Sequence, residues 1–63
     1  MKVNAAFIFI APEVDYKNHR SVIDTSTVKL TVIGVKNYSE AETVAQELVE
    51  QGVKAIELCA GFG

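Results

Sequence analysis

The chain has 63 residues, which allows one small domain and excludes a large self-contained enzyme. Hydrophobic residues make up 49% of the chain and charged residues 22%, a balance that predicts a folded soluble domain rather than a disordered segment. Six basic and eight acidic side chains give a net charge of −2, so no broad positive field exists to attract nucleic acid.

The first predicted element is a strand from about Val3 to Ala11. It is apolar on both faces, as is typical of a central strand in a parallel sheet, and Pro12 ends it by removing a backbone donor. Its apolar run is far shorter than the roughly 18 residues that span a bilayer, so no membrane partner is predicted. Residues 13–27 then form a polar loop, in which a helical turn from Tyr16 to Ile23, capped by Asp15, is one of two open alternatives.

The second predicted strand runs from Val28 to Val35, beginning half-solvated and ending buried. Gly34 lies inside this strand, where glycine costs about 0.5–1 kcal/mol relative to alanine. Its presence therefore indicates either a bulge or a close backbone approach.

A helix is predicted from about Ser39 to Gln51. Ser39 and Glu42 match a capping box, in which each side chain accepts a hydrogen bond from the other residue's backbone amide. The apolar residues that follow recur at helical spacing, namely Ala41, Val44, Ala45, Leu48 and Val49. Gly52 stands where a left-handed C′ residue belongs, and Val53 would close a Schellman motif.

The third predicted strand runs from Lys54 to Ala60, so that the chain contains a βαβ unit. The predicted fold is a three-stranded, mostly parallel α/β sheet with one helix, part of a flavodoxin-like or Rossmann-like layer. One helix covers one face of such a sheet, so the second apolar face requires a partner copy or chain beyond Gly63. We therefore expect residues 1–63 to form one domain that is incomplete at its C-terminus and assembles with itself.

Candidate site residues follow from the rule that ligands bind at the carboxyl ends of parallel strands. Glu57 is the first catalytic candidate, because burial would raise the pKa of a carboxyl group on an apolar strand and suit it for proton transfer. The alternative is that Glu57 faces solvent or pairs with Lys29 or Lys54. Glu13 and His19 are the other catalytic candidates, and His19 is equally explained as a solvated loop residue.

The ligand-binding candidates are Arg20, Asn37, Cys59, Gly61 and Gly63. Arg20 would clamp an anion, and the two glycines resemble the opening of a phosphate loop, although a simple turn explains them equally. Cys59 is either a nucleophile with His19 as its base or a small buried hydrophobic residue. A lone cysteine closes no disulfide within the chain, offers no zinc-ligand spacing and suits the reducing cytoplasm, so neither a metal nor a cofactor is predicted.

Four segments carry a family resemblance: AAFIFIAPEVD, HRSVIDT, LTVIGVKNYSEA and GVKAIELCAGFG. Together they resemble an uncharacterised family of small bacterial α/β proteins, a domain of unknown function with about one hundred residues in its longer members. The resemblance implies a further helix and strand, and it brings no catalytic residues to this chain. We expect a self-associating domain without catalysis, with a small enzyme or metabolite-binding protein as the alternative.

Overall fold

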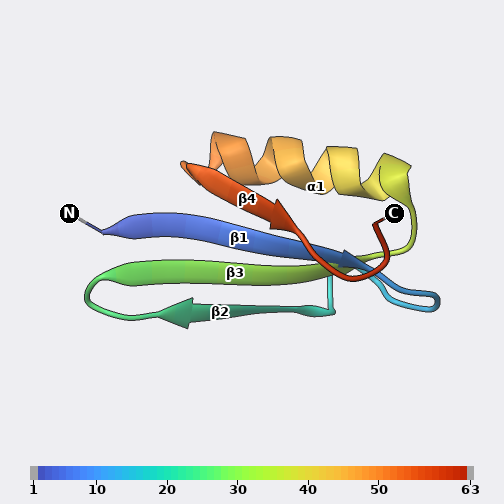
Figure 1. Cartoon of the computed structure of the whole chain (residues 1–63), viewed down its shortest axis with the longest axis horizontal. Helices are drawn as coiled ribbons and strands as arrows, with labels where there is room; N and C mark the ends of the chain where they lie inside the picture. Colours follow the sequence, from blue (N-terminus) through green and yellow to red (C-terminus); the bar gives the residue numbers. More distant parts are fainter. Residues whose placement is uncertain (1, 63) are drawn as a thin grey trace.

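The computed structural model describes residues 2–62 and consists of two layers, a four-stranded sheet and one helix (Figure 1). The elements in chain order are β1 (Val3–Ile10), β2 (Arg20–Asp24), β3 (Val28–Val35), α1 (Tyr38–Glu50) and β4 (Ala55–Leu58). The strand order in the sheet is β2-β3-β1-β4, so β1 and β3 are the inner strands.

The sheet is mixed. β1 pairs in parallel with β3 and with β4, whereas β2 pairs antiparallel with β3 at one edge. The three strands that the sequence predicts are therefore parallel, and the bounds predicted for β3 are confirmed. The predicted fold class is nevertheless wrong, because the sheet has four strands with an antiparallel edge and is not a mostly parallel three-stranded layer of flavodoxin-like or Rossmann-like kind.

The fourth strand, β2, replaces the second half of the helix considered for Tyr16–Ile23. Asp15 does start a single turn, since its backbone oxygen accepts a hydrogen bond from the His19 amide at 2.7 Å. The chain then extends, because the edge of β3 offers its backbone groups as partners and β-branched Val22 and Ile23 suit a strand. A short turn at 25–27 joins β2 to β3, and Thr25 Oγ1 accepts a hydrogen bond from the Val28 amide at 2.9 Å.

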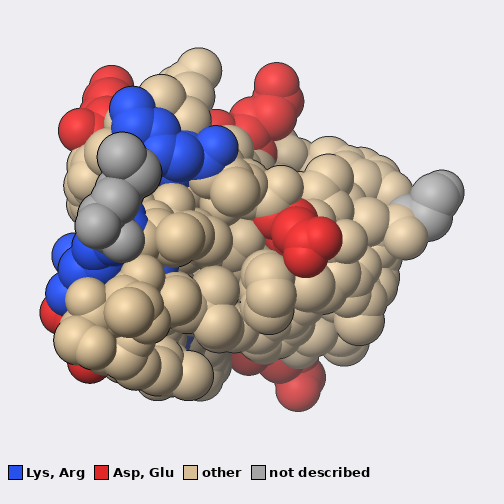
Figure 2. Space-filling model, turned by 60° about the vertical axis from the view of Figure 1, so that its left-hand side comes forward, with Lys and Arg blue, Asp and Glu red and all other residues tan. Residues whose placement is uncertain are grey.

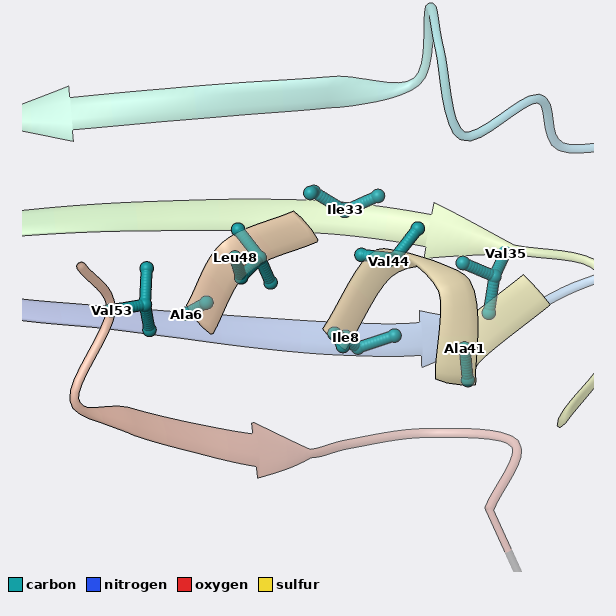
Figure 3. Packing of buried hydrophobic residues seen from close by; sticks show 8 residues of the cluster. All are labelled: Ala6, Ile8, Ile33, Val35, Ala41, Val44, Leu48 and Val53. Atoms are coloured by element: carbon teal, nitrogen blue, oxygen red, sulfur yellow. The ribbon is translucent and has the colours of Figure 1, made fainter. Parts of the chain in front are cut away.

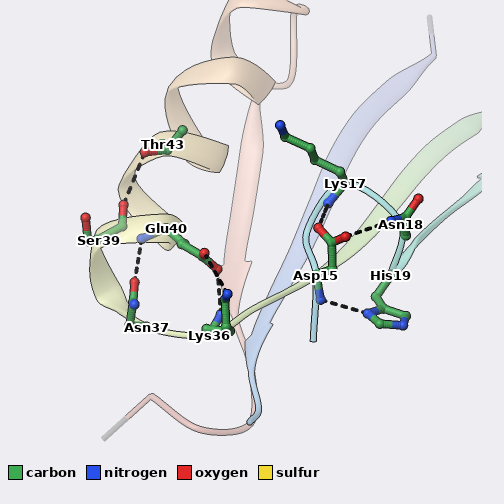
Figure 4. Close-up of polar contacts among 9 residues, drawn as sticks. All are labelled: Asp15, Lys17, Asn18, His19, Lys36, Asn37, Ser39, Glu40 and Thr43. Atoms are coloured by element: carbon green, nitrogen blue, oxygen red, sulfur yellow. Dashed lines mark hydrogen bonds and ion pairs between the residues drawn. The ribbon is translucent and has the colours of Figure 1, made fainter. Parts of the chain in front are cut away.

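The N-cap of α1 lies two residues before the predicted cap, Ser39. Asn37 is the N-cap: its Oδ1 accepts a hydrogen bond from the Glu40 amide at 2.8 Å (Figure 4). Glu40 reaches back, and its carboxylate accepts a hydrogen bond from the Lys36 amide at 2.9 Å. The capping box predicted for Ser39 and Glu42 is therefore wrong, because Ser39 already lies inside the first turn.

The end of α1 is confirmed as a Schellman motif. The amide of Val53 donates to the carbonyl of Leu48, and the amide of Gly52 donates to that of Val49, each at 3.0 Å. Gly52 has a φ of 91°, a left-handed conformation that glycine adopts without steric cost. This turn places Val53 in the core and leads the chain directly into β4.

The hydrophobic core lies between α1 and one face of the sheet (Figure 3). The sheet contributes one alternate set of residues from β1 and β3, and the helix contributes its apolar stripe. The buried residues are Ala6, Ile8, Ile33, Val35, Ala41, Val44, Leu48 and Val53. Six of these side chains, including Ile8, Ile33 and Leu48, are fully buried, so the core is small but closed.

Gly34 is explained by a close approach rather than a bulge, because β1 and β3 pair without interruption through this position. It lies beside Phe9 in the register, and the Phe9 ring covers it. A Cβ atom at Gly34 would lie 2.5 Å from Phe9 Cζ. Because Gly34 has no side chain, the Phe9 ring can lie directly on the backbone of β3.

The opposite face of the sheet has no covering layer among residues 2–62, as the sequence predicts. Residues alternate between the two faces of a strand, so the register assigns one set to this surface, which we call the open face. The open face comprises Val3, Ala5, Phe7 and Phe9 of β1, Ser21 and Ile23 of β2, Val28, Leu30 and Val32 of β3, and Ala55 and Glu57 of β4. None of these side chains is fully shielded from solvent.

Candidate functional site

The carboxyl ends of the parallel strands are covered in part by residues 59–62. The Cys59 amide donates to the Ile8 carbonyl at 2.8 Å, and the Ile10 amide donates to the Ala60 carbonyl at 2.9 Å. Beyond them, the Phe62 ring lies 5.5 Å from that of Tyr38 at the start of α1. Backbone pairing and aromatic packing therefore occupy much of the edge where a ligand was predicted.

The predicted acid and base do not meet in one chain. Glu57 lies on the edge strand β4, whereas the His19 carbonyl accepts a hydrogen bond from the Gly34 amide beside the opposite edge strand, β2. Three strand spacings of about 4.8 Å separate these two edges. Glu13 lies in the turn after β1 with a φ of 64°, and its exposed side chain joins neither of them.

The structure gives several predicted ligand-binding residues a structural role. Arg20 pairs with Glu47 of α1 at 3.0 Å and donates from Nε to the Tyr16 carbonyl, so it ties β2 to the helix. Asn37 caps α1. Gly61, with a φ of 92°, turns the chain where a side chain would collide with the Ile10 backbone. Gly63 lies outside the described residues.

Cys59 and Glu57 are both exposed. The interpretation of Cys59 as a buried hydrophobic residue is therefore wrong, because β4 is a short edge strand whose last two residues are exposed, as is Cys59 after them. The solvent-facing alternative for Glu57 is confirmed. Within residues 2–62 its carboxylate forms no ion pair, with Lys29, Lys54 or any other residue, so the buried proton-transfer role does not apply.

The loop before β2 is held by a dense set of hydrogen bonds around Asp15 (Figure 4). The Asp15 carboxylate accepts from the Lys17 amide at 2.9 Å and from Asn18 Nδ2 at 2.6 Å, and these two bonds hold the pKa of Asp15 below its ordinary value. The Asp15 amide in turn donates to His19 Nδ1 at 2.8 Å. His19 is thus oriented by the loop, at the margin of the open face.

Two surface hollows lie near the predicted site residues. One, of about 380 Å³, lies at the β2 end of the open face and is lined by Phe9, Asn18, His19, Arg20, Ser21 and Val32. The other, of about 280 Å³, lies between α1 and β4 and is almost wholly apolar, with Tyr38, Leu58 and Phe62 in its lining. Neither contains a cluster of catalytic side chains.

Charge is unevenly distributed over the surface. Figure 2 shows Lys and Arg side chains gathered on one side, whereas much of the remaining surface in that view is uncharged. The register places Lys29 beside Asn4, whose carbonyl accepts a hydrogen bond from the Lys54 amide, so these lysines lie near the amino ends of the parallel strands. Across residues 2–62, no three His, Cys, Asp or Glu side chains could together hold a metal ion.

The open face is the feature that most needs a functional explanation. Its inner residues, Ala5, Phe7, Phe9, Leu30 and Val32, are apolar and only partly shielded by their neighbours. Glu57 is the only charged side chain that the four strands place on it. The sequence predicts an uncovered apolar face, because strands that are apolar on both sides need two covering layers and one helix supplies only one. Which residues form this face follows only from the register.

The fold and this surface define a small two-layer α/β domain with one apolar sheet face open. The sequence matches a family of unknown function (DUF6506) over residues 3–63, so the chain belongs to that family and the predicted resemblance to an uncharacterised family is confirmed. No curated protein and no solved structure matches the chain. None of the helices in the described part of the chain is long and apolar enough to span a membrane.

Proposed function

We propose that this domain is an assembly module, which pairs with a second copy of itself through the open face. The observation that carries this proposal is the apolar surface that extends across all four strands. Glu57 is the one charged residue that these strands place on it. Monomeric proteins rarely expose a contiguous apolar patch of more than a few hundred Å², and larger patches mark interaction sites. A flat apolar sheet face is matched best by another sheet, packed about 10 Å away.

The size of the open face sets how strong such a pairing can be. The strands β1 and β3 have eight residues each, β2 has five and β4 has four, which at about 3.3 Å per residue gives a summed strand length near 80 Å. At a strand spacing of about 4.8 Å, this length corresponds to a face of about 400 Å². Each copy would therefore bury about 400 Å², and the pair about 800 Å², which is the size of a weak, reversible interface.

The experiment is sedimentation equilibrium on the purified domain from micromolar to millimolar concentration. We expect a reversible dimer with twice the 6.8 kDa mass of one chain. Leu30→Lys places a charge in the middle of the open face and should weaken association at least tenfold, with the circular dichroism spectrum unchanged. Val49→Lys is the matched control, because Val49 is an exposed apolar residue of α1 on the other side of the molecule.

A mass of one chain over the whole concentration range would overturn the proposal. So would equal weakening by Leu30→Lys and Val49→Lys, because association would then not depend on the open face. The alternative of a small enzyme or metabolite-binding site at the carboxyl ends has no comparable support, since the candidate side chains are divided between the two edges of the sheet.

For the location of the protein we propose the reducing cytoplasm. The support is Cys59, a single exposed thiol with no second cysteine in the chain to pair with. In an oxidising compartment such a thiol would cross-link two copies. Non-reducing electrophoresis of protein taken directly from cells tests this, and a disulfide-linked dimer there would contradict the proposal.

A further inference from the structure

The polar groups of the open face lie at its two opposite edges. The register places Ser21, Val32, Phe7 and Glu57 in one row across the four strands. His19 lies one step further along the β2 edge, where its carbonyl bonds to the Gly34 amide. The β2 edge thus carries hydrogen-bond donors and the β4 edge carries a carboxylate, with apolar side chains between them.

These edge groups have unused hydrogen-bonding capacity within one chain. His19 Nδ1 accepts a hydrogen bond from the Asp15 amide, which leaves the proton of the neutral imidazole on Nε2. Within residues 2–62, neither His19 Nε2, nor the Ser21 hydroxyl, nor the Glu57 carboxylate has a hydrogen-bond partner. Burial of such groups is costly unless each finds one, so an interface on the open face must pair them.

Two symmetric arrangements can stack this face on itself. In both, the two-fold axis runs between the two sheets and parallel to their plane. If this axis is perpendicular to the strands, β2 lies over β2 and β4 over β4, so that the two Glu57 carboxylates lie on the same edge and repel each other. An axis parallel to the strands places β2 of each copy over β4 of the other. Each Glu57 then lies opposite the partner's Ser21, and each Phe7 ring lies opposite the partner's Val32.

We propose that the second copy binds with the two-fold axis parallel to the strands, and that Glu57 accepts hydrogen bonds from the Ser21 hydroxyl and His19 Nε2 of the partner subunit. This inference rests on the proposed function and adds the geometry and the polar pairs of the dimer. The two edges are complementary, donors against a carboxylate, and two-fold symmetry forms the same contact twice. Glu57 is thereby a specificity residue of the interface rather than a catalytic one.

The test is site-specific cross-linking in a Cys59→Ser background. Ser21→Cys and Glu57→Cys variants are prepared separately, then mixed, equilibrated and treated with a short bismaleimide. We expect cross-linked heterodimers in the mixture and few cross-links in either variant alone, as judged by intact mass. Cross-linking of the Ser21→Cys variant with itself would overturn the inference, because it indicates the perpendicular axis.

Sedimentation separates failure of the geometry from failure of the proposed function. A dimer by sedimentation that gives no heterodimer cross-link overturns the geometry and leaves association through the open face standing. A monomer by sedimentation overturns both. As a second measurement, Glu57→Lys should raise the dimer dissociation constant at least tenfold, whereas Glu50→Lys on the exposed side of α1 should leave it unchanged; equal effects of the two would also overturn the inference.

Discussion

The two faces of this sheet are built from similar residues and have opposite environments. On the helix side, Ile8 and Ile33 are fully buried beneath α1, whereas on the open face their neighbours Phe7 and Val32 stay partly exposed. The strands themselves are apolar in both directions, so strand hydrophobicity does not specify which face the helix covers. One helix is sufficient for one face only, and among residues 2–62 the second face has no covering layer.

The largest expected effect comes from matched truncations on the two sides of this comparison. Leu48→Ala removes a fully buried side chain of α1 and should lower the free energy of unfolding by about 2–5 kcal/mol, because the small core cannot close the cavity. Leu30→Ala on the open face should cost less than half as much in dilute solution. Urea unfolding followed by circular dichroism measures both.

The comparison of Leu30→Ala with Leu48→Ala can be repeated at several protein concentrations. If the open face is buried in a dimer, the cost of Leu30→Ala should grow as protein concentration rises, whereas that of Leu48→Ala should not. Should Leu48→Ala fail to fold, the milder Ile33→Val, expected to cost about 0.5–1.5 kcal/mol, takes its place. Equal costs for the two leucines in dilute solution would contradict the distinction between the two faces.

A smaller effect is expected at Gly34, where the open face is shaped by an absent side chain. Gly34→Ala places a Cβ atom against the Phe9 ring and should destabilise the domain by about 1–3 kcal/mol. Phe9→Ala in the same chain should make the Gly34 substitution nearly neutral, because the ring is what the new atom meets. Additive costs in this double-mutant cycle would show that the ring is not responsible.

The start of α1 provides a third test, on the helix side. Asn37→Ala removes the side chain that accepts from the Glu40 amide and should cost about 1 kcal/mol. Ser39→Ala is the matched control, and we expect less than about 0.5 kcal/mol, since Ser39 lies within the first turn. The reverse order in thermal or urea unfolding would restore the capping box at Ser39.

The smallest expected effect concerns pH. Hydrogen bonds lower the pKa of Asp15 and of Asp24 from the ordinary value of 3.8, chiefly from the Lys17 amide to Asp15 and from the Lys2 ammonium to Asp24. A carboxyl group with a lowered pKa in the folded state stabilises the fold at higher pH and loses this contribution as the pH falls through the folded value.

Stability should therefore decrease on acidification below about pH 4, and an Asp15→Asn, Asp24→Asn double variant should lose less over the same interval. Glu50→Gln is the control, because its carboxylate bonds to none of the described residues. Urea midpoints compared at about pH 5 and about pH 3 give the result. An acid loss as steep in the double variant as in the parent chain would contradict the assignment.

Much of the fold follows from local sequence patterns. The bounds of β3, the Schellman motif at Gly52 and the parallel relation of β1, β3 and β4 are each predicted and confirmed. The strand β2 is missed because Arg20–Asp24 has no long apolar alternation and becomes a strand by pairing with the edge of β3. The cap of α1 is displaced because Asn37 and Glu40 compete with Ser39 and Glu42 for the same role.

For the candidate site, too, local patterns predicted some features and long-range pairing decided the others. Sequence rules gather Glu57, Glu13 and His19 at one edge, because the carboxyl ends of parallel strands meet there. The strand order β2-β3-β1-β4 instead sends Glu57 and His19 to opposite sides of the sheet. Strand order depends on contacts between segments far apart in the chain, and no local pattern encodes it.

By itself, the sequence determined that three apolar strands and one helix follow each other here, with more apolar strand surface than one helix can cover. Those properties depend on composition and on periodicities of two and 3.6 residues, which are local. Only the tertiary structure decided which residues form the open face, where its one carboxylate lies and that Arg20 is committed to Glu47. The physical reason is that register and strand order arise from long-range pairing, in which a shift of one residue exchanges the two faces of a strand.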